Sequence, residues 1–198
     1  MELFGDHRLH LPDAELDWYP HWLPSAQADA WLQALIEQVS WSQPQVQLFG
    51  RWHRVPRLVA WYGDPQASYG YSGQRHQPLA WTALLQSIRQ AVEQAAGASF
   101  NAVLLNYYRD GQDCMGWHSD DEAELGAQPC IASLSLGQAR RFDLRRRGSQ
   151  RIEHSVLLEH GSLLVMRGPT QHHWQHQVAR SRKISAPRIN LTFRRVNP

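Results

Sequence analysis

The feature that most constrains the fold is a change of sequence pattern close to residue 98. Before it, two segments have the apolar periodicity of amphipathic helices: one opens at Pro24-Ser25, and one covers residues 79–96, with Gly97 as its C-cap. After it, turn residues separate seven short segments of strand composition: 100–108, 130–136, 141–145, 152–158, 162–166, 173–178 and 188–194. Two helices followed by many short strands predict an α+β chain with a double-sheet jelly-roll core.

The region between the two helices has weaker patterns. Residues 45–49 and 57–62 have the composition of short strands, joined by a basic and aromatic connection. Residues 69–73 contain two glycines and are predicted to form a loop.

The length of 198 residues is most simply that of one domain with a substantial core. No window approaches the ~20 apolar residues of a membrane span, and no basic segment followed by an apolar signal core opens the chain. Cys114 and Cys130 do not form a Cys-x-x-Cys pair, which argues against a disulfide framework or a structural zinc site. We therefore expect a cytoplasmic protein without a membrane partner.

The small formal net charge of +2 conceals an uneven distribution of charge along the chain. Residues 1–40 contain seven acidic side chains and one basic one, whereas the chain from Arg140 onward contains thirteen basic and three acidic side chains. A basic region of that size suits a polyanion, because neutralised phosphates supply most non-specific affinity for DNA. For a single cluster such as Arg145-Arg146-Arg147, an ordinary solvated surface is the simpler interpretation.

A histidine and a carboxylate two residues apart occur within Met115-Gly116-Trp117-His118-Ser119-Asp120-Asp121-Glu122. In an extended segment, His118 and Asp120 point the same way and provide two ligands of a facial triad, the set that binds non-haem Fe(II) and leaves positions open. A surface hydrogen bond or salt bridge is the ordinary alternative. His176 lies downstream as a third ligand, although spacing alone does not distinguish it from His172, which would share a strand face with it, or from His173.

The segment 188–194 alternates between polar and apolar residues. Arg188, Asn190, Thr192 and Arg194 share one face of a strand, and three apolar residues share the other. The polar face either meets water, as in a half-buried antiparallel strand, or turns into a barrel where two guanidiniums meet a dicarboxylate.

These patterns together resemble one known family. His-x-Asp, a distant His and the Arg-x-Asn-x-Thr-x-Arg strand resemble the AlkB family of Fe(II)- and 2-oxoglutarate-dependent nucleic-acid dealkylases, and further segments match it in order. The segments are Asn106-Tyr107-Tyr108-Arg109, residues 129–135, residues 48–53, Val55-Pro56-Arg57 and Tyr62-Gly63-Asp64. Those before residue 65 are most similar to the homologues that act on double-stranded DNA.

The resemblance implies a fold, a set of cofactors and a reaction. It implies a double-stranded β-helix core over residues 98–195, an N-terminal helical part over 1–44 and a nucleotide-recognition lid over 45–78. It assigns Fe(II) to His118, Asp120 and His176. It assigns 2-oxoglutarate to Asn106, Tyr108, Arg188, Asn190, Thr192 and Arg194. With O2, the implied reaction demethylates 1-methyladenine and 3-methylcytosine and releases formaldehyde, succinate and CO2.

The resemblance also implies how the damaged base is held. Methylation weakens pairing and so lowers the cost of flipping the base out of the stack. A flat cationic ring suits an aromatic face with carboxylates nearby. The implied substrate residues are Tyr69, Gly70 and Tyr71 in the recognition loop, with Tyr71 and His118 on either side of the base, Asp121 and Glu122 as the negative charge, and Phe49, Gly50 and Arg51 as a finger that enters the duplex.

Departures from the double-strand-specific members leave the strand preference open. The basic hairpin between Leu144 and Ile152 is shorter, and Met115-Gly116-Trp117 differs from their pattern just before the metal ligands. We also expect the N-terminal extension of nuclear members to be absent. We expect a monomer that acts on double-stranded DNA, with single-stranded DNA, RNA or protein as alternative substrates. A non-catalytic, metal-containing DNA-binding module is the alternative of a different class.

Overall fold

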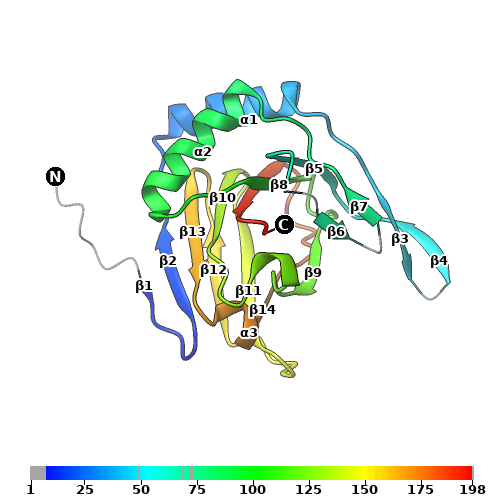
Figure 1. The fold of residues 1–198 in the computed structure, drawn as a ribbon. Helices are drawn as coiled ribbons and strands as arrows, with labels where there is room; N and C mark the ends of the chain where they lie inside the picture. The colour runs from blue at the N-terminus through cyan, green and yellow to red at the C-terminus, as the bar shows by residue number, and fades with distance from the viewer. Residues whose placement is uncertain (1–7, 49, 68, 72–73, 198) are drawn as a thin grey trace.

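Two antiparallel sheets face each other, and two helices cover the outer side of the larger one (Figure 1). This computed structural model describes residues 8–48, 50–67, 69–71 and 74–197. The larger sheet has seven strands in the order β1-β2-β13-β10-β15-β8-β5, and the smaller has four in the order β12-β11-β14-β9. This is the predicted jelly roll, and the α+β class is confirmed.

The bounds of the elements are as follows. The larger sheet comprises β1 (Arg8–Leu9), β2 (Glu15–Tyr19), β13 (Ser162–Arg167), β10 (Ile131–Gly137), β15 (Arg188–Arg194), β8 (Ala102–Tyr108) and β5 (Leu58–Gly63). The smaller comprises β12 (His154–Leu158), β11 (Arg140–Arg146), β14 (Trp174–Val178) and β9 (Met115–His118). Two hairpins are formed by β3 (Gln45–Leu48) with β4 (Arg51–Arg54), and by β6 (Tyr69–Tyr71) with β7 (Gln74–His76). The helices are α1 (Ser25–Gln38), α2 (Ala83–Ala96), α3 (Thr170–His173) and the short 3-10 helix η1 (Ala123–Leu125).

The main hydrophobic core lies between the helices and the larger sheet. Leu35 of α1 and Ile88 of α2 belong to one buried cluster with Leu134 of β10 and Leu191 of β15. A second buried cluster includes residues of both sheets, among them Phe142, Leu144 and Met166. The helices therefore hold one face of β15 and leave its other face to the space between the sheets.

The ends of α2 show where sequence signals were sufficient and where they were not. Gly97 adopts a left-handed conformation with φ of +60°, which confirms the predicted C-cap. The helix was predicted from residue 79, but it begins at Ala83, after Thr82 accepts a hydrogen bond from the Leu85 backbone N–H. Leu79 instead forms an isolated β-bridge with Tyr62. An N-cap threonine outweighs the apolar pattern that continues before it.

Three further expectations differ from the structure. The N-terminal part contains two strands besides its helix, and β2 pairs with β13 along its whole length. Residues 69–76 contain a hairpin rather than a glycine-punctuated loop. Residue 173 ends α3 instead of opening a strand, so His172 does not share a strand face with His176. These are short elements, for which pairing partners rather than local pattern decide the conformation.

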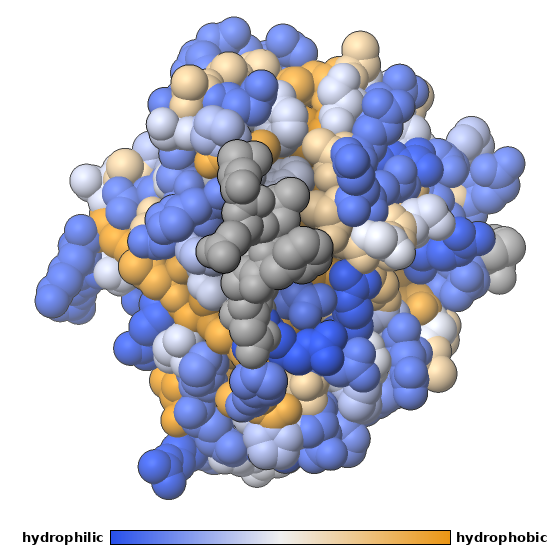
Figure 2. All heavy atoms as spheres, turned by 90° about the vertical axis from the view of Figure 1, so that its left-hand side faces the viewer, coloured by the Kyte–Doolittle hydropathy of each residue, from blue (hydrophilic) through white to orange (hydrophobic). Residues whose placement is uncertain are grey.

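The surface is mostly hydrophilic on the side that carries the N-terminal strands, with apolar side chains showing between polar ones (Figure 2). Among the described residues, no helix combines the length and the apolar character needed to cross a membrane.

Candidate active site

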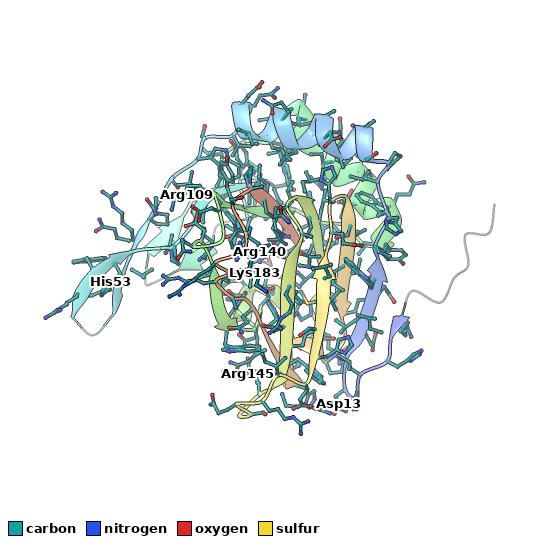
Figure 3. All side chains as sticks on the ribbon, turned by 180° about the vertical axis from the view of Figure 1, so that it is seen from behind. Asp13, His53, Arg109, Arg140, Arg145 and Lys183 are labelled. Atoms are coloured by element: carbon teal, nitrogen blue, oxygen red, sulfur yellow. The ribbon has the colours of Figure 1, made fainter. Side chains whose placement is uncertain are left out.

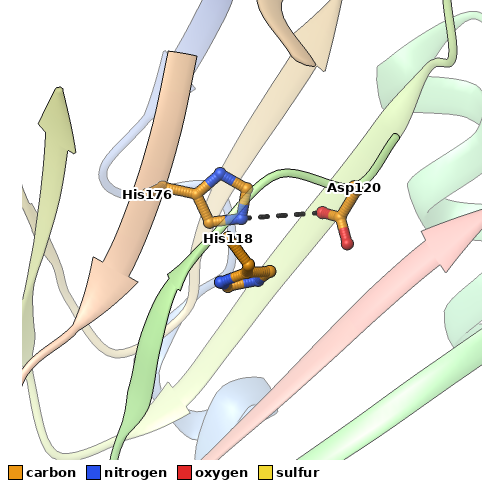
Figure 4. A group of neighbouring side chains, drawn as sticks. All are labelled: His118, Asp120 and His176. Carbon is orange, nitrogen blue, oxygen red and sulfur yellow. Dashed lines mark ion pairs between the residues drawn. The ribbon is translucent and has the colours of Figure 1, made fainter. Parts of the chain in front are cut away.

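Three potential metal ligands converge between the two sheets. His118 ends β9, Asp120 follows it by two residues, and His176 lies in the middle of β14 (Figure 4). One ligand atom from each residue lies within 4.8 Å of the others. The distance from His176 Nε2 to Asp120 Oδ2 is 3.7 Å, and the two imidazole centroids lie 4.2 Å apart. Backbone pairing brings the two histidines together, because His118 and His176 are partners in the β9–β14 register.

The ligand side chains are oriented by neighbours that do not belong to the cluster. His118 Nδ1 donates to the Gly116 carbonyl oxygen at 2.8 Å, which leaves Nε2 as the ligand atom. The Asp120 backbone N–H donates to Gln171 Oε1 at 2.9 Å. The ring of His176 stacks on Phe142 with a centroid distance of 4.9 Å. These contacts orient the two imidazoles and hold the backbone of the third ligand.

The protonation states of two ligands suit a divalent metal. Burial, aided by the nearby His118, lowers the pKa of His176 to about 3, so its imidazole is neutral at physiological pH. For Asp120, burial raises the pKa, but Arg194 and the two histidines outweigh burial and lower it overall. Metal ligands must be deprotonated. The cluster therefore presents two imidazoles and one carboxylate, the donor set of a facial triad.

The two other candidate histidines lie away from this cluster. His172 and His173 are exposed and belong to α3. His172 Nε2 contacts the Ala127 carbonyl oxygen instead. Within the described part of the chain, the three ligands above form the one group of this kind.

A cavity of about 410 Å³ adjoins the cluster. Its wall on the larger sheet includes the six residues that the family resemblance assigned to 2-oxoglutarate: Asn106, Tyr108, Arg188, Asn190, Thr192 and Arg194. The polar face of β15 therefore turns into the barrel, because every residue of this strand is buried. The alternative of a polar face in water is wrong.

Most of this wall is satisfied by internal hydrogen bonds. Asn190 Nδ2 donates to Ser133 Oγ at 2.8 Å and to the Leu134 carbonyl at 3.0 Å, while its Oδ1 accepts from Thr192 Oγ1 at 3.0 Å. Arg194 Nη2 donates to Asp120 Oδ1 at 3.0 Å. Arg194 therefore also orients a carboxylate of the metal cluster.

Arg188 is the main exception in this wall, although Arg194 Nε also lacks a partner among the described residues. Its Nη2 donates to Ser135 Oγ at 2.9 Å, but Nε and Nη1 are buried without a hydrogen-bond partner among the described residues. The side chain is 1% exposed, and burial lowers its pKa to about 10, which still leaves the guanidinium charged at neutral pH. A buried N–H without a partner costs free energy. Arg188 lines the cavity, and a guanidinium with two donors still unpartnered suits a carboxylate ligand.

Comparison with known proteins decides the family. A family model described as the 2OG-Fe(II) oxygenase superfamily matches residues 15–194. The chain belongs to this superfamily. The DNA oxidative demethylase ALKBH2 of Bos taurus is 43% identical over 87% of this chain and 66% of its own length. That of Homo sapiens is 42% identical over 86% of this chain and 69% of its own length.

The chain is thus a member of the AlkB family, as its motifs predicted, and it spans about two thirds of the length of these relatives. A solved structure, "The structure of OsALKBH1", superposes with a TM-score of 0.68 at 20% identity and covers 95% of this chain and 100% of that one. This likeness supports the jelly-roll fold. Membership makes the chain an Fe(II)- and 2-oxoglutarate-dependent dioxygenase.

The residues predicted to bind the AlkB substrate lie in several places. Gly50 occupies the turn between β3 and β4 with φ of +77°, and Arg51 opens β4 in an exposed position. Tyr69, Gly70 and Tyr71 form β6. Phe49 lies outside the described residues. The predicted finger is therefore placed only through its flanking positions.

The two acidic residues after Asp120 lie in different surroundings. Asp121 forms an exposed ion pair with Arg147, whereas Glu122 lines the cavity. An exposed ion pair contributes little to stability.

Sequence reasoning missed two residues that support the site. Arg57 is buried and its Nε donates to Asn106 Oδ1 at 2.6 Å. This hydrogen bond orients Asn106, one of the residues predicted to bind the dicarboxylate. Gln171 is also buried and fixes the backbone at Asp120. Arg57 lies in a Val-Pro-Arg segment that the resemblance included, so a role was within reach. Nothing local to Gln171 signals its contact across 51 residues.

Proposed function

We propose that this protein is a DNA oxidative demethylase that removes methyl groups from 1-methyladenine and 3-methylcytosine and prefers double-stranded DNA. The observation that carries the proposal is the combination, in one cavity, of a facial triad with a buried guanidinium that has two unpartnered nitrogens. The relatives are named as DNA oxidative demethylases, which supplies the substrate class. Fe(II), 2-oxoglutarate and O2 together supply the oxidising chemistry, with succinate, CO2 and formaldehyde as the released products.

In this proposal, the residues divide into three groups. His118, Asp120 and His176 hold the iron. Asn106, Tyr108, Arg188, Asn190, Thr192 and Arg194 hold 2-oxoglutarate. Phe49, Gly50, Arg51, Tyr69, Gly70, Tyr71, Asp121 and Glu122 contact DNA. Of the two acidic residues, Glu122 faces the cationic base, since it lines the cavity, and Asp121 acts at the surface.

The two ends of 2-oxoglutarate have different partners along β15. Arg194 contacts a metal ligand, so the end of the strand that it occupies lies beside the iron. Arg188 lies six residues earlier, at the other end of β15. When bound, 2-oxoglutarate would have its 2-oxo acid group at the metal end of β15, and its distal carboxylate would be held by Arg188. The guanidinium would then form two hydrogen bonds that it lacks in the free protein.

The hairpin of β3 and β4 supports the preference for a duplex. It extends away from both sheets (Figure 1), and all four residues of β4 are exposed. Two of them are arginines, and Trp52 is 65% exposed. Cationic side chains suit phosphates, and an apolar side chain at a hairpin tip suits a separated base step. A lid over residues 45–78 and a single domain over 1–198 complete the proposed organisation.

The test is repair of matched oligonucleotides that carry one 3-methylcytosine, as a single strand and as a duplex, with Fe(II) and 2-oxoglutarate. We expect demethylation of both by mass spectrometry and faster turnover on the duplex. A higher rate on the single strand, or on RNA, would replace the duplex preference by the alternative substrates. Tight DNA binding without any demethylation would support a non-catalytic metal-containing module instead.

A further inference from the structure

The guanidinium of a further buried arginine, Arg140, lies close to the ring of Tyr108, as that of Arg188 does. The Arg188 guanidinium carbon lies 5.2 Å from the Tyr108 ring centroid, and that of Arg140 lies 5.5 Å from it. Arg140 opens β11 in the smaller sheet, whereas the other two residues belong to the larger one. Arg140 is 2% exposed, and nothing in its sequence context signals a buried position.

The direct hydrogen-bond partners of Arg140 are backbone carbonyls, and the carboxylates of Asp110 and Asp113 lie near enough to act on its charge. Its Nη1 donates to the Asp110 carbonyl at 3.1 Å, and its Nη2 donates to the carbonyls of Asp113 and Ala179 at 2.9 and 2.8 Å. The Asp113 side chain is already bound by Arg109 through two nitrogens at 2.7 and 2.9 Å. Among the described residues, Arg140 forms no salt bridge. Its positive charge is therefore not neutralised by a direct partner.

The three carbonyls belong to the segments that follow β8 and β14. Asp110 and Asp113 lie on the connection from β8 to β9, which joins Tyr108 to His118. Ala179 follows β14, the strand that carries His176. Figure 3 labels Arg140 and Arg145 toward opposite ends of β11. One guanidinium thus fastens the ends of β8 and β14 to each other.

Two buried cations with one aromatic ring near them favour an anion at that place. A ring face attracts a cation, so Arg140 fixes the orientation of the Tyr108 ring. Burial lowers the pKa of Arg188, and the charge of Arg140 lowers it further. A carboxylate bound at Arg188 relieves this repulsion, and in a low-dielectric cavity it is attracted by both guanidiniums.

We propose that Arg140 is a positioning residue that gives the cavity its selectivity for a dicarboxylate, by holding Tyr108 against Arg188 and adding a second positive charge next to the ring. This inference rests on the proposed function, because it concerns the distal carboxylate of 2-oxoglutarate. Arg140 acts through Tyr108 and its own charge, and it does not belong to the six residues that the sequence grouped at this site.

The experiment compares two ligands that differ in the distal carboxylate. Isothermal titration calorimetry measures binding of 2-oxoglutarate and of 2-oxobutyrate to the full-length Mn(II)-loaded protein without oxygen. The wild type is compared with R140M, which removes the charge, and R140K, which retains the charge and loses the fork. R141M is the matched control, because Arg141 is the exposed neighbour on the same strand and pairs with Asp143.

We expect R140M to raise the Kd for 2-oxoglutarate by about tenfold, equivalent to ~1.4 kcal/mol, and to leave the Kd for 2-oxobutyrate and for Mn(II) within about twofold. R140K should raise the Kd for 2-oxoglutarate by a smaller factor, and R141M should change none of them. Weakening of both ligands by the same factor in R140M would show a purely structural role and overturn the inference, as would unchanged binding of 2-oxoglutarate.

Two further outcomes are informative. If R140M does not fold, the test rests on R140K. A ratio of the Kd values for 2-oxoglutarate and 2-oxobutyrate that is unchanged from the wild type then overturns the inference. If the wild type itself does not bind 2-oxoglutarate, the proposed function fails, which is a different result from a wild type that binds while R140M binds equally well.

Discussion

The two faces of β15 are equally buried but do different things. Ile189, Leu191 and Phe193 face the helices and are 0% exposed. Arg188 and Arg194 face the cavity and are 1% and 3% exposed. Each apolar residue gains free energy from leaving water. Each arginine is buried at a cost.

This difference shows which face of β15 still has hydrogen-bond donors for a ligand. The apolar face of the strand is complete in the free protein, whereas the polar face keeps unpartnered donors at Arg188 Nε, Arg188 Nη1 and Arg194 Nε. Rigid helices on one side hold these donors in place on the other. Such preorganisation is what a binding site requires, because donors that are already fixed lose little freedom when a ligand arrives. The comparison predicts that changes on the two faces affect different measurements.

The largest expected effect is on the cavity side, at the metal ligands. His118→Ala should abolish demethylation, since a facial triad without one imidazole no longer holds its metal. The melting temperature of the metal-free protein should change little, because this side chain is partly exposed and lies at the end of β9. Activity and melting curves of one preparation check both statements. Retention of wild-type turnover would show that His118 is not a ligand.

The helix-facing side should show the opposite behaviour. Leu191→Ala removes a buried side chain from the main core and should reduce the free energy of unfolding by about 2–5 kcal/mol. Turnover per folded molecule should stay close to that of the wild type at a temperature where the variant is folded. Urea unfolding with a parallel activity assay measures both. Loss of turnover without loss of stability would mean that the two faces are not separable.

Arg188→Lys sharpens the comparison within the cavity. The substitution keeps a positive charge but removes the planar fork, so the half-saturating concentration of 2-oxoglutarate should rise on the order of tenfold, and that of DNA much less. Titration of each substrate at a saturating level of the other separates the two effects. Equal increases for both substrates would argue against a carboxylate at Arg188.

Trp52→Ala tests the exposed hairpin, which belongs to neither face. The exposed indole contributes little to the core, so the melting temperature should not change and repair of single strands should persist. Repair of duplexes should fall by up to about tenfold if ~1.4 kcal/mol of contact with DNA is lost. Leu157→Ala, at an exposed position on β12, is the matched control. The same loss on both substrates would remove the hairpin from duplex recognition.

The smallest effect is expected at His173. His173→Ala should keep wild-type turnover and iron binding, because the residue is exposed in α3 and lies outside the metal cluster. Iron content by absorption spectrometry and initial rates check this. Loss of iron from this variant would reopen the choice of the third ligand.

Strong periodicity made the central strand predictable, whereas contacts between distant segments were not. The alternation of Arg188 to Arg194 identified both faces of β15, and its residue pattern, together with the His-x-Asp pair and a distant histidine, indicated the family. Which way the polar face points could not be predicted from the strand alone, because it depends on the helices that cover the opposite face. Asp121 and Glu122 show the limit at a finer scale, since adjacent carboxylates look alike in sequence and lie in different surroundings.

Short elements were also difficult to predict from the sequence. β2 has five residues and is a strand because β13 pairs with it. The turn of α3 separates His173 from the strand that begins at Trp174, although a continuous strand fitted the pattern. In both cases the partner, distant in sequence, decides the conformation. Arg140 belongs here as well, because its burial depends on three carbonyls from two other segments.

The most direct test of the central claim is the stoichiometry of the reaction on a duplex with one 3-methylcytosine. Formaldehyde and succinate are measured together after anaerobic loading with Fe(II), addition of 2-oxoglutarate and admission of oxygen. We predict one formaldehyde for each methyl group removed and no release without 2-oxoglutarate. Binding of the duplex with no formaldehyde from a fully iron-loaded protein would contradict the account.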